Sequence, residues 1–290
     1  MIFHWNPDPV AFSIDFLHLH IHWYGICFAT GFFLAYLISR VLCKIKGYPV
    51  DKLDTLLLVM FTGTVVGARI CHVVFYQPQY FWEHPLEILY IWQGGLASHG
   101  GVVGAAIAFT WFCIRNREFS PMWMLDHMSI AFGVGAACIR LGNFMNSEIV
   151  GIPTDGTYGI VFDRLGTQPL HPVMLYESFC YFMCSFTALV LYKLKFGNRP
   201  GFMFGTYIAM AFTSRMILEV VKSGQAEYEI EMNEYLSQYV SLPFFVSVGM
   251  LLSIPFILVG IGFMIYGITH YDPDSEKPLS CTDAAAPAQK

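Results

Sequence analysis

Three arginines interrupt long apolar stretches of this 290-residue chain: Arg69 in VVGARICHVV, Arg140 in GAACIRLGNF and Arg215 in MAFTSRMILE. A guanidinium keeps its charge at any ordinary pH, and placing it at bilayer depth costs roughly 3 kcal/mol on insertion scales. An acidic partner, water or a bound anion normally balances such a charge. Two converging arginines can hold a phosphate through paired hydrogen bonds. The arginines therefore predict a cationic pocket inside a membrane.

Other polar residues accompany these arginines. Asn143 follows Arg140 by three positions, which puts both on one helical face. Glu219 follows Arg215 by four positions, so an internal ion pair is the alternative to ligand binding there. His99, in GGLASHGG, joins a side chain suited to proton transfer with glycines and a helix start that can cradle an anion. Tyr24, in HWYG, fits either the pocket or an interfacial anchor.

A metal site is the competing interpretation of three histidines, His18, His20 and His22, in HLHIH. On a helix, this spacing would point them to different sides, and no carboxylate pair or second histidine motif supports them. The eight cysteines show no paired metal spacing and no compact disulfide framework, so we interpret them as small core residues. We therefore expect no metal and no cofactor.

Composition places the chain in a membrane. Only 13% of its residues are charged and 56% are hydrophobic, against about 25% charged residues in soluble domains. The N-terminus has no basic region before its first apolar run, so we expect that run to be retained rather than cleaved. No basic stripe suggests nucleic acid binding. These features predict an all-α, polytopic membrane protein.

Seven apolar stretches are long enough to cross about 30 Å of hydrocarbon. We expect one transmembrane catalytic domain over residues 1–271 and a disordered tail over 272–290. The predicted spans are 21–43, 54–76, 96–114, 123–145, 173–194, 201–222 and 243–268.

Lysines and arginines set the expected orientation, because they concentrate in alternate loops and favour the cytoplasmic side. The N-terminus is then outside and the C-terminus is cytoplasmic. The outer segments are an aromatic interfacial stretch at 77–93, a polar loop at 146–172 and an acidic loop at 225–241. The cytoplasmic set comprises Arg40, Lys44, Lys46, Lys52, Arg115, Arg117, Lys193, Lys195 and Arg199.

On this topology, five helices bring their polar residues to the outer third of the bilayer. A cationic pocket at that depth, rimmed by aromatic side chains, fits an anionic phospholipid headgroup. With a histidine or tyrosine to take a proton, it predicts a transferase acting on a lipid. The alternatives are a lipid-binding or transport protein that uses the same arginines, and a membrane metalloenzyme that uses the three histidines. We find no polar lining continuous to the cytoplasmic side, as a channel would need.

From about residue 20 to 268 the chain resembles the prolipoprotein diacylglyceryl transferases. The most specific block runs from Arg140 to Gly151 and fits R-L-G-N-F-x-N-x-E-x-x-G at every fixed position. Supporting blocks occur in family order: His22-Trp-Tyr-Gly25, Gly94-Gly-Leu-Ala-Ser-His-Gly-Gly101, His171-Pro-Val-Met-Leu-Tyr-Glu177, and Arg215 with Glu219. One departure is Lys222, which stands where many members carry arginine.

The resemblance implies transfer of the diacylglyceryl group of phosphatidylglycerol to the lipobox cysteine of a preprolipoprotein. A thioether forms and glycerol 1-phosphate leaves. It also implies a bacterial inner-membrane location with the active site toward the outer leaflet, and we expect a monomer. We assign catalysis to Tyr24, His99, Arg140 and Arg215. The residues expected to bind phosphatidylglycerol are Arg69, Arg140, Asn143, Asn146, Glu148, Gly151, Arg215 and Glu219.

Overall fold

The computed structural model describes residues 2–14, 16, 19–91, 95, 97–222 and 247–275. The prediction of an all-α polytopic membrane protein is confirmed, because six described helices are long and apolar enough to cross a bilayer. The expected span at 96–114 corresponds to α4 (Ser98–Arg115), whose apolar part is shorter. The six helices are α1 (Trp23–Lys46), α2 (Asp51–Phe75), α5 (Pro121–Met145), α6 (Val173–Lys193), α7 (Phe202–Leu218) and α9 (Val248–Thr269).

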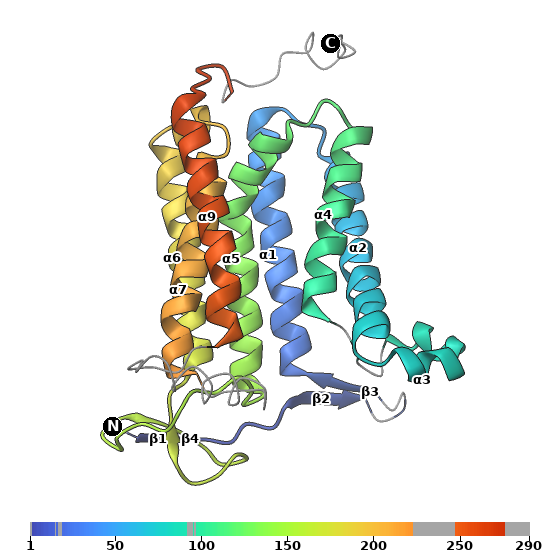
Figure 1. Ribbon diagram of the computed structural model, residues 1–290, viewed down its shortest axis with the longest axis vertical. Coiled ribbons are helices and arrows are strands. Elements are labelled where there is room, and N and C mark those ends of the chain that lie inside the picture. Colours follow the sequence, from blue (N-terminus) through green and yellow to red (C-terminus); the bar gives the residue numbers. More distant parts are fainter. Residues whose placement is uncertain are drawn as a thin grey trace, which may run out of the picture. The chain divides into compact units, whose positions relative to one another are not determined.

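The chain forms two compact units, one from residues 1–39 and 125–276 and the other centred on residues 40–124. In the first unit, α5, α6, α7 and α9 run side by side (Figure 1). Small residues let the helices approach closely: a Cβ on Gly205 of α7 would lie 2.5 Å from the carbonyl oxygen of Gly260 in α9. A Cβ on Gly133 of α5 would lie 2.5 Å from the carbonyl oxygen of Tyr181 in α6. Gly133 therefore allows α5 and α6 to pack closely.

A buried carboxylate fixes the start of α7. Oδ2 of Asp126 accepts from the amide of Gly201 at 2.7 Å, and Oδ1 accepts from the amide of Phe204 at 2.8 Å. These amides have no partner within their own helix, since they belong to its first turn. Asp126 on α5 therefore caps α7 from a neighbouring helix, and this sets how far α7 is shifted along α5.

Short strands cover the end of the first unit at which α1 begins (Figure 1). Strand β1 (Ile2–Trp5) pairs in parallel with β4 (Gly159–Phe162), and β4 pairs with β5 (Pro169–Leu170). Strands β2 (Val10–Ile14) and β3 (Leu19–His22) form a separate antiparallel pair. The sequence analysis predicted none of these strands and described 146–172 only as a loop. Four-residue strands that pair across more than 150 positions leave no periodic signal.

Residues 19–22 of the HLHIH motif form strand β3, where we expected a helix. His20 and His22 belong to β3, and residues two apart on a strand share one face. The spacing therefore does not separate His20 from His22, contrary to the prediction made for a helix. His18 lies outside the described residues. Among the residues that are described, no group of three or more His, Cys, Asp or Glu side chains is placed to hold a metal ion.

In the second unit, α2 and α4 pack through glycines. A Cβ on Gly67 of α2 would lie 2.8 Å from the Cα of Gly104 in α4. The expected interfacial segment forms two short helices, α3 (Pro78–Glu83) and the 3-10 helix η2 (Pro85–Leu89). Trp82 on α3 is 89% exposed, and Trp92 lies outside the described residues. The acidic loop 225–241 and the tail from residue 276 onward lie there as well.

Candidate functional site

Four charged side chains form a buried cluster in the first unit. Nε of Arg140, on α5, lies 2.7 Å from Oε2 of Glu177, on α6. Nζ of Lys222 lies 3.9 Å from Oε1 of Glu177 and 3.7 Å from Oε2 of Glu219. Neither oxygen of Glu177 accepts a well-aligned hydrogen bond from the described residues, so the pairing is mainly coulombic. Glu177 is only 2% exposed, so both cations compensate a deeply buried charge.

Arg215 adds a third cation to this cluster. Its charge acts on Lys222 and on Tyr181, and Arg140 acts on the same two residues. The ion pairs of the described residues join Glu219 to Lys222 and not to Arg215. Among the buried groups, three cations face the carboxylates of Glu177 and Glu219, which leaves one net positive charge. Glu148, which Asn143 joins to Arg140, is exposed to solvent and is not counted here. A buried region with that surplus attracts an anion.

The turn after α5 links Arg140 to a carboxylate at the surface. Nη1 of Arg140 donates to Oδ1 of Asn143 at 3.2 Å, and Nδ2 of Asn143 donates to Oε2 of Glu148 at 3.2 Å. Nδ2 of Asn146 donates to the other carboxylate oxygen, Oε1, at 3.1 Å. Ser147 has a φ of 57°, a left-handed conformation that reverses the chain here. The chain reversal lets Glu148 receive both amides.

Gly151 fills a position where only glycine fits. Its amide donates to the carbonyl of His171 at 2.8 Å, and the residue forms an isolated β-bridge with Lys222. A Cβ on Gly151 would lie 2.5 Å from the carbonyl oxygen of Val221 and 2.6 Å from Cγ2 of Val173. The glycine therefore lets the turn after α5 reach the segment that carries Lys222.

A cavity of about 840 Å³ opens beside this turn. Its lining includes Tyr24 and Gly25 from the start of α1, together with Asn146, Glu148 and Arg164. The charges of Glu148 and Arg140 both act on Tyr24. Tyr24 therefore stands at the cavity and within electrostatic range of the buried cluster.

Burial sets the protonation behaviour of Lys222. Desolvation lowers the pKa of this lysine from its ordinary value, and the carboxylates of Glu177 and Glu219 offset the effect only in part. Nearby Arg215 and Arg140 lower it further, because a third cation is unfavourable there. The net charge of the cluster is thus sensitive to alkaline pH through Lys222.

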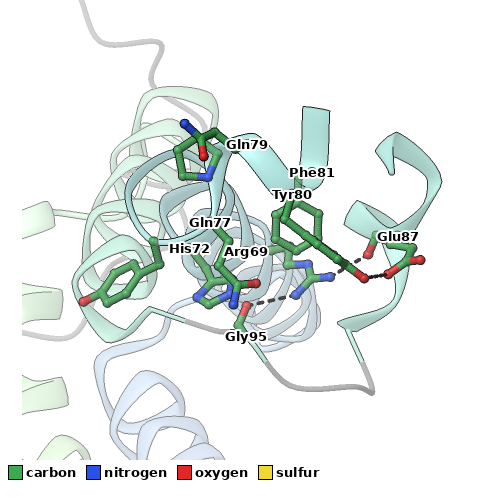
Figure 2. A pocket seen from close by; sticks show the side chains of 10 residues that line it. Arg69, His72, Gln77, Gln79, Tyr80, Phe81, Glu87 and Gly95 are labelled. Atoms are coloured by element: carbon green, nitrogen blue, oxygen red, sulfur yellow. Dashed lines mark hydrogen bonds between the residues drawn. The ribbon is translucent and has the colours of Figure 1, made fainter. Parts of the chain in front are cut away.

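The second unit holds Arg69 in a polar pocket of about 690 Å³ (Figure 2). The Arg69 guanidinium donates to the carbonyls of Glu87 at 2.6 Å, Ile88 at 2.8 Å and Gly95 at 3.1 Å. It also lies 5.0 Å from the ring centre of Phe81. These contacts give Arg69 a structural task, which is to fasten η2 and the chain before α4 to α2.

The structure brings together most of the predicted site residues in the first unit. Arg140, Asn143, Asn146, Glu148 and Glu219 are joined by the contacts above. His99 lies in the first turn of α4, in the second unit, and its side chain is outside the described part.

Two members of the cluster were not among the predicted site residues. They are Glu177 and Lys222. The signal for Glu177 was available, because it is an isolated carboxylate near the start of an apolar stretch, which is costly without a partner.

Apolar helices around a buried charged cluster define a multi-span membrane protein with an ionic site in its interior. A family model described as prolipoprotein diacylglyceryl transferase matches residues 9–266. The chain belongs to this family.

Curated relatives agree over nearly their whole length. A phosphatidylglycerol–prolipoprotein diacylglyceryl transferase of Tolumonas auensis is 42% identical, covering 90% of this chain and 96% of the relative. The enzyme of the same name from Chloroherpeton thalassium is 40% identical, covering 86% and 92%. That from Bacteroides fragilis is 34% identical, covering 90% and 94%.

Proposed function

We propose that this protein transfers the diacylglyceryl group of phosphatidylglycerol to the lipobox cysteine of a preprolipoprotein, the first step of lipoprotein maturation. The thiolate sulfur attacks the glyceryl carbon that carries the phosphate ester. A C–S bond forms, the C–O bond breaks, and glycerol 1-phosphate leaves with the electron pair. The family membership and the names of the relatives support this reaction.

The single observation that carries the proposal is the surplus positive charge around Arg140. Glu177 and Asn143 hold two different nitrogens of its guanidinium, so the group is oriented before any ligand binds. Arg140 and Arg215 bind the phosphate and stabilise the charge that grows on it as the C–O bond breaks. A preoriented guanidinium is effective here because it needs little reorganisation during the reaction.

The other predicted residues take supporting roles in this proposal. His99 removes the proton of the thiol, since the thiolate is the reactive form. Tyr24 orients the headgroup or assists in proton transfer. Asn143, Asn146 and Glu148 shape the pocket, while Gly151 and Glu219 hold the segment that carries Lys222.

The contacts of Arg69 favour a structural role over the predicted contact with phosphatidylglycerol. In the proposed setting, the protein acts as a monomer in the bacterial inner membrane. Its active site faces the outer leaflet and admits phosphatidylglycerol and the signal peptide from that side.

The direct test is an assay with purified, detergent-solubilised protein, phosphatidylglycerol and a synthetic lipobox peptide. We expect the peptide to gain the mass of a diacylglyceryl group on its cysteine, with equimolar glycerol phosphate release, and Arg140→Ala to abolish both. Phosphatidylglycerol binding without either product would instead indicate a lipid-binding or transport protein.

A further inference from the structure

The cavity beside β3 and the start of α1 has a lining that does not include Arg140, Glu177, Glu219 or Lys222 of the buried cluster. Hydrogen bonds through Asn143 nevertheless link Arg140 to Glu148, which lines the cavity. We propose that this cavity is the docking site of the acceptor peptide, while the phospholipid headgroup binds at the cluster around Arg140. This inference rests on the proposed function, and it assigns the two substrates to two compartments. The reaction needs such a division, because two substrates must approach one reacting carbon from different directions.

Glu148 is the link between the two compartments. One of its carboxylate oxygens accepts from Asn143, whose own oxygen accepts from Arg140 in the cluster. The other oxygen accepts from Asn146, which lines the cavity together with Glu148 itself. Two side chains, those of Glu148 and Asn143, therefore connect a ligand in the cavity to the Arg140 guanidinium, which in this proposal binds the phosphate.

The chemistry of the cavity wall disfavours a phosphate and favours a peptide. Glu148 contributes a negative charge, which repels an anion. The Oδ1 atom of Asn146 is buried and has no hydrogen-bond partner among the described residues. Ionised phosphate oxygens have no proton to give this acceptor, whereas each main-chain N–H of an extended peptide does. Among the described residues that line the cavity, the one arginine, Arg164, donates to the carbonyl of Pro7, and its charge offsets that of Glu148, so the lining has no surplus positive charge for a phosphate.

The residues that line the cavity also suit an extended chain. His20, Ile21 and His22 of β3 form one wall. Strand β3 belongs to a two-stranded sheet and pairs with β2 along one edge. Its other edge has no strand partner within this sheet, and a peptide can pair there by adding a strand. Two small residues, Gly25 and Ala29, also line the cavity, and no atom lies within 4 Å of a Cβ built on Gly25. A peptide paired with β3 would run toward Tyr24, where the cysteine thiol would meet the headgroup compartment.

Gly25 provides a direct test, because it lines the cavity and a Cβ built on it has open space around it. In Gly25→Leu we expect KM for a synthetic lipobox peptide to rise at least tenfold, with KM for phosphatidylglycerol unchanged. The matched control is Gly262→Leu, a glycine of α9 that also has no atom within 4 Å of a built Cβ, and it should keep wild-type kinetics. Folding of both variants is checked by thermal unfolding in detergent.

A second measurement needs no variant. A lipobox peptide with a photoreactive residue next to its cysteine, irradiated with the wild-type protein, should form adducts with residues of β3 and the first two turns of α1. The peptide assignment is wrong if Gly25→Leu changes only KM for phosphatidylglycerol or leaves both KM values unchanged. It is also wrong if the adducts lie only elsewhere. Wild-type protein without turnover, but with adducts at β3, would count against the proposed reaction and not against the docking site.

Discussion

Nε of Arg140 lies 2.7 Å from Oε2 of Glu177, and Nη1 of the same guanidinium donates to Asn143 at 3.2 Å. The two contacts come from different elements, since Glu177 belongs to α6 and Asn143 to α5 itself. The hydrogen bond to Asn143 orients the guanidinium, and the charge of Glu177 holds it in place. A site built in this way needs the several N–H donors of an arginine, and it needs the carboxylate of Glu177 to hold that arginine in place.

Replacing Arg140 by lysine should abolish most of the activity. Lysine keeps the charge but is a single point donor, so it cannot bind phosphate, Glu177 and Asn143 in one plane. We expect kcat to fall by about 100-fold or more, the usual loss when one transition-state donor is removed. Initial rates of peptide lipidation measure this loss. The same substitution at the exposed Arg117 is the control, and activity within twofold of wild type in Arg140→Lys would refute bidentate binding.

Glu177→Gln tests whether the charge of Glu177 positions Arg140. The amide keeps the shape but removes the charge that balances Arg140 and Lys222. We expect kcat to fall about 100-fold, since misplacing a catalytic group by an ångström has that effect, and stability to fall by about 3 kcal/mol. Glu177→Asp should recover part of the rate.

The matched control for Glu177 is Glu118→Gln, which breaks the ion pair with Lys52 in the second unit. Its rate should stay near that of wild type. If Glu177→Gln loses stability but keeps its rate per folded molecule, then Glu177 is a structural residue and does not position Arg140 for catalysis.

Lys222→Arg should change the response of the enzyme to alkaline pH. Burial lowers the pKa of Lys222, so its ammonium loses the proton at a lower pH than that of a free lysine. The cluster then loses its surplus positive charge and holds phosphate less well. Arginine stays charged throughout, so the ratio of variant to wild-type rates should be about 1 near pH 7 and rise with pH. Parallel pH–rate profiles would exclude Lys222 as the titrating group.

Gly151→Ala should damage the site by a steric route. The added methyl group would meet a backbone oxygen at 2.5 Å, and backbone cannot rotate away as a side chain can. We expect the bridge to Lys222 to open, with a loss of about 2 kcal/mol in stability and at least tenfold in rate. Gly135→Ala in α5, where the nearest atom lies at 3.8 Å, is the control and should fold normally.

Arg69→Lys separates a structural role from phosphate binding. Lysine cannot reproduce the contacts with the carbonyls of Glu87, Ile88 and Gly95. We expect faster amide hydrogen exchange over residues 78–91 and lower thermal stability, with KM for phosphatidylglycerol within about threefold of wild type. A large rise in KM for phosphatidylglycerol without faster exchange would instead indicate that Arg69 binds the phospholipid.

The sequence allowed the helices and much of the charged cluster to be predicted, because both leave local signals. Long apolar runs indicate membrane helices, and an arginine inside such a run is conspicuous, as with Arg140. The pairing of Arg140 with Glu177 joins residues 37 positions apart, and only the packing of α5 against α6 brings them together. Strand β3 was missed because four residues beside a membrane helix look like part of that helix.

The parallel pairing of β1 with β4 restricts how the chain threads the bilayer. The strands exchange main-chain hydrogen bonds, so residues 2–5 and 159–162 are on the same face of the membrane. A chain that leaves a face and returns to it crosses an even number of times. Between the two strands lie α1, α2 and α5, each long and apolar enough to cross once, so we infer that the shorter α4 crosses as well. If α6, α7 and α9 beyond β4 also cross once each, the two termini lie on opposite sides of the membrane, as the distribution of lysines and arginines predicts.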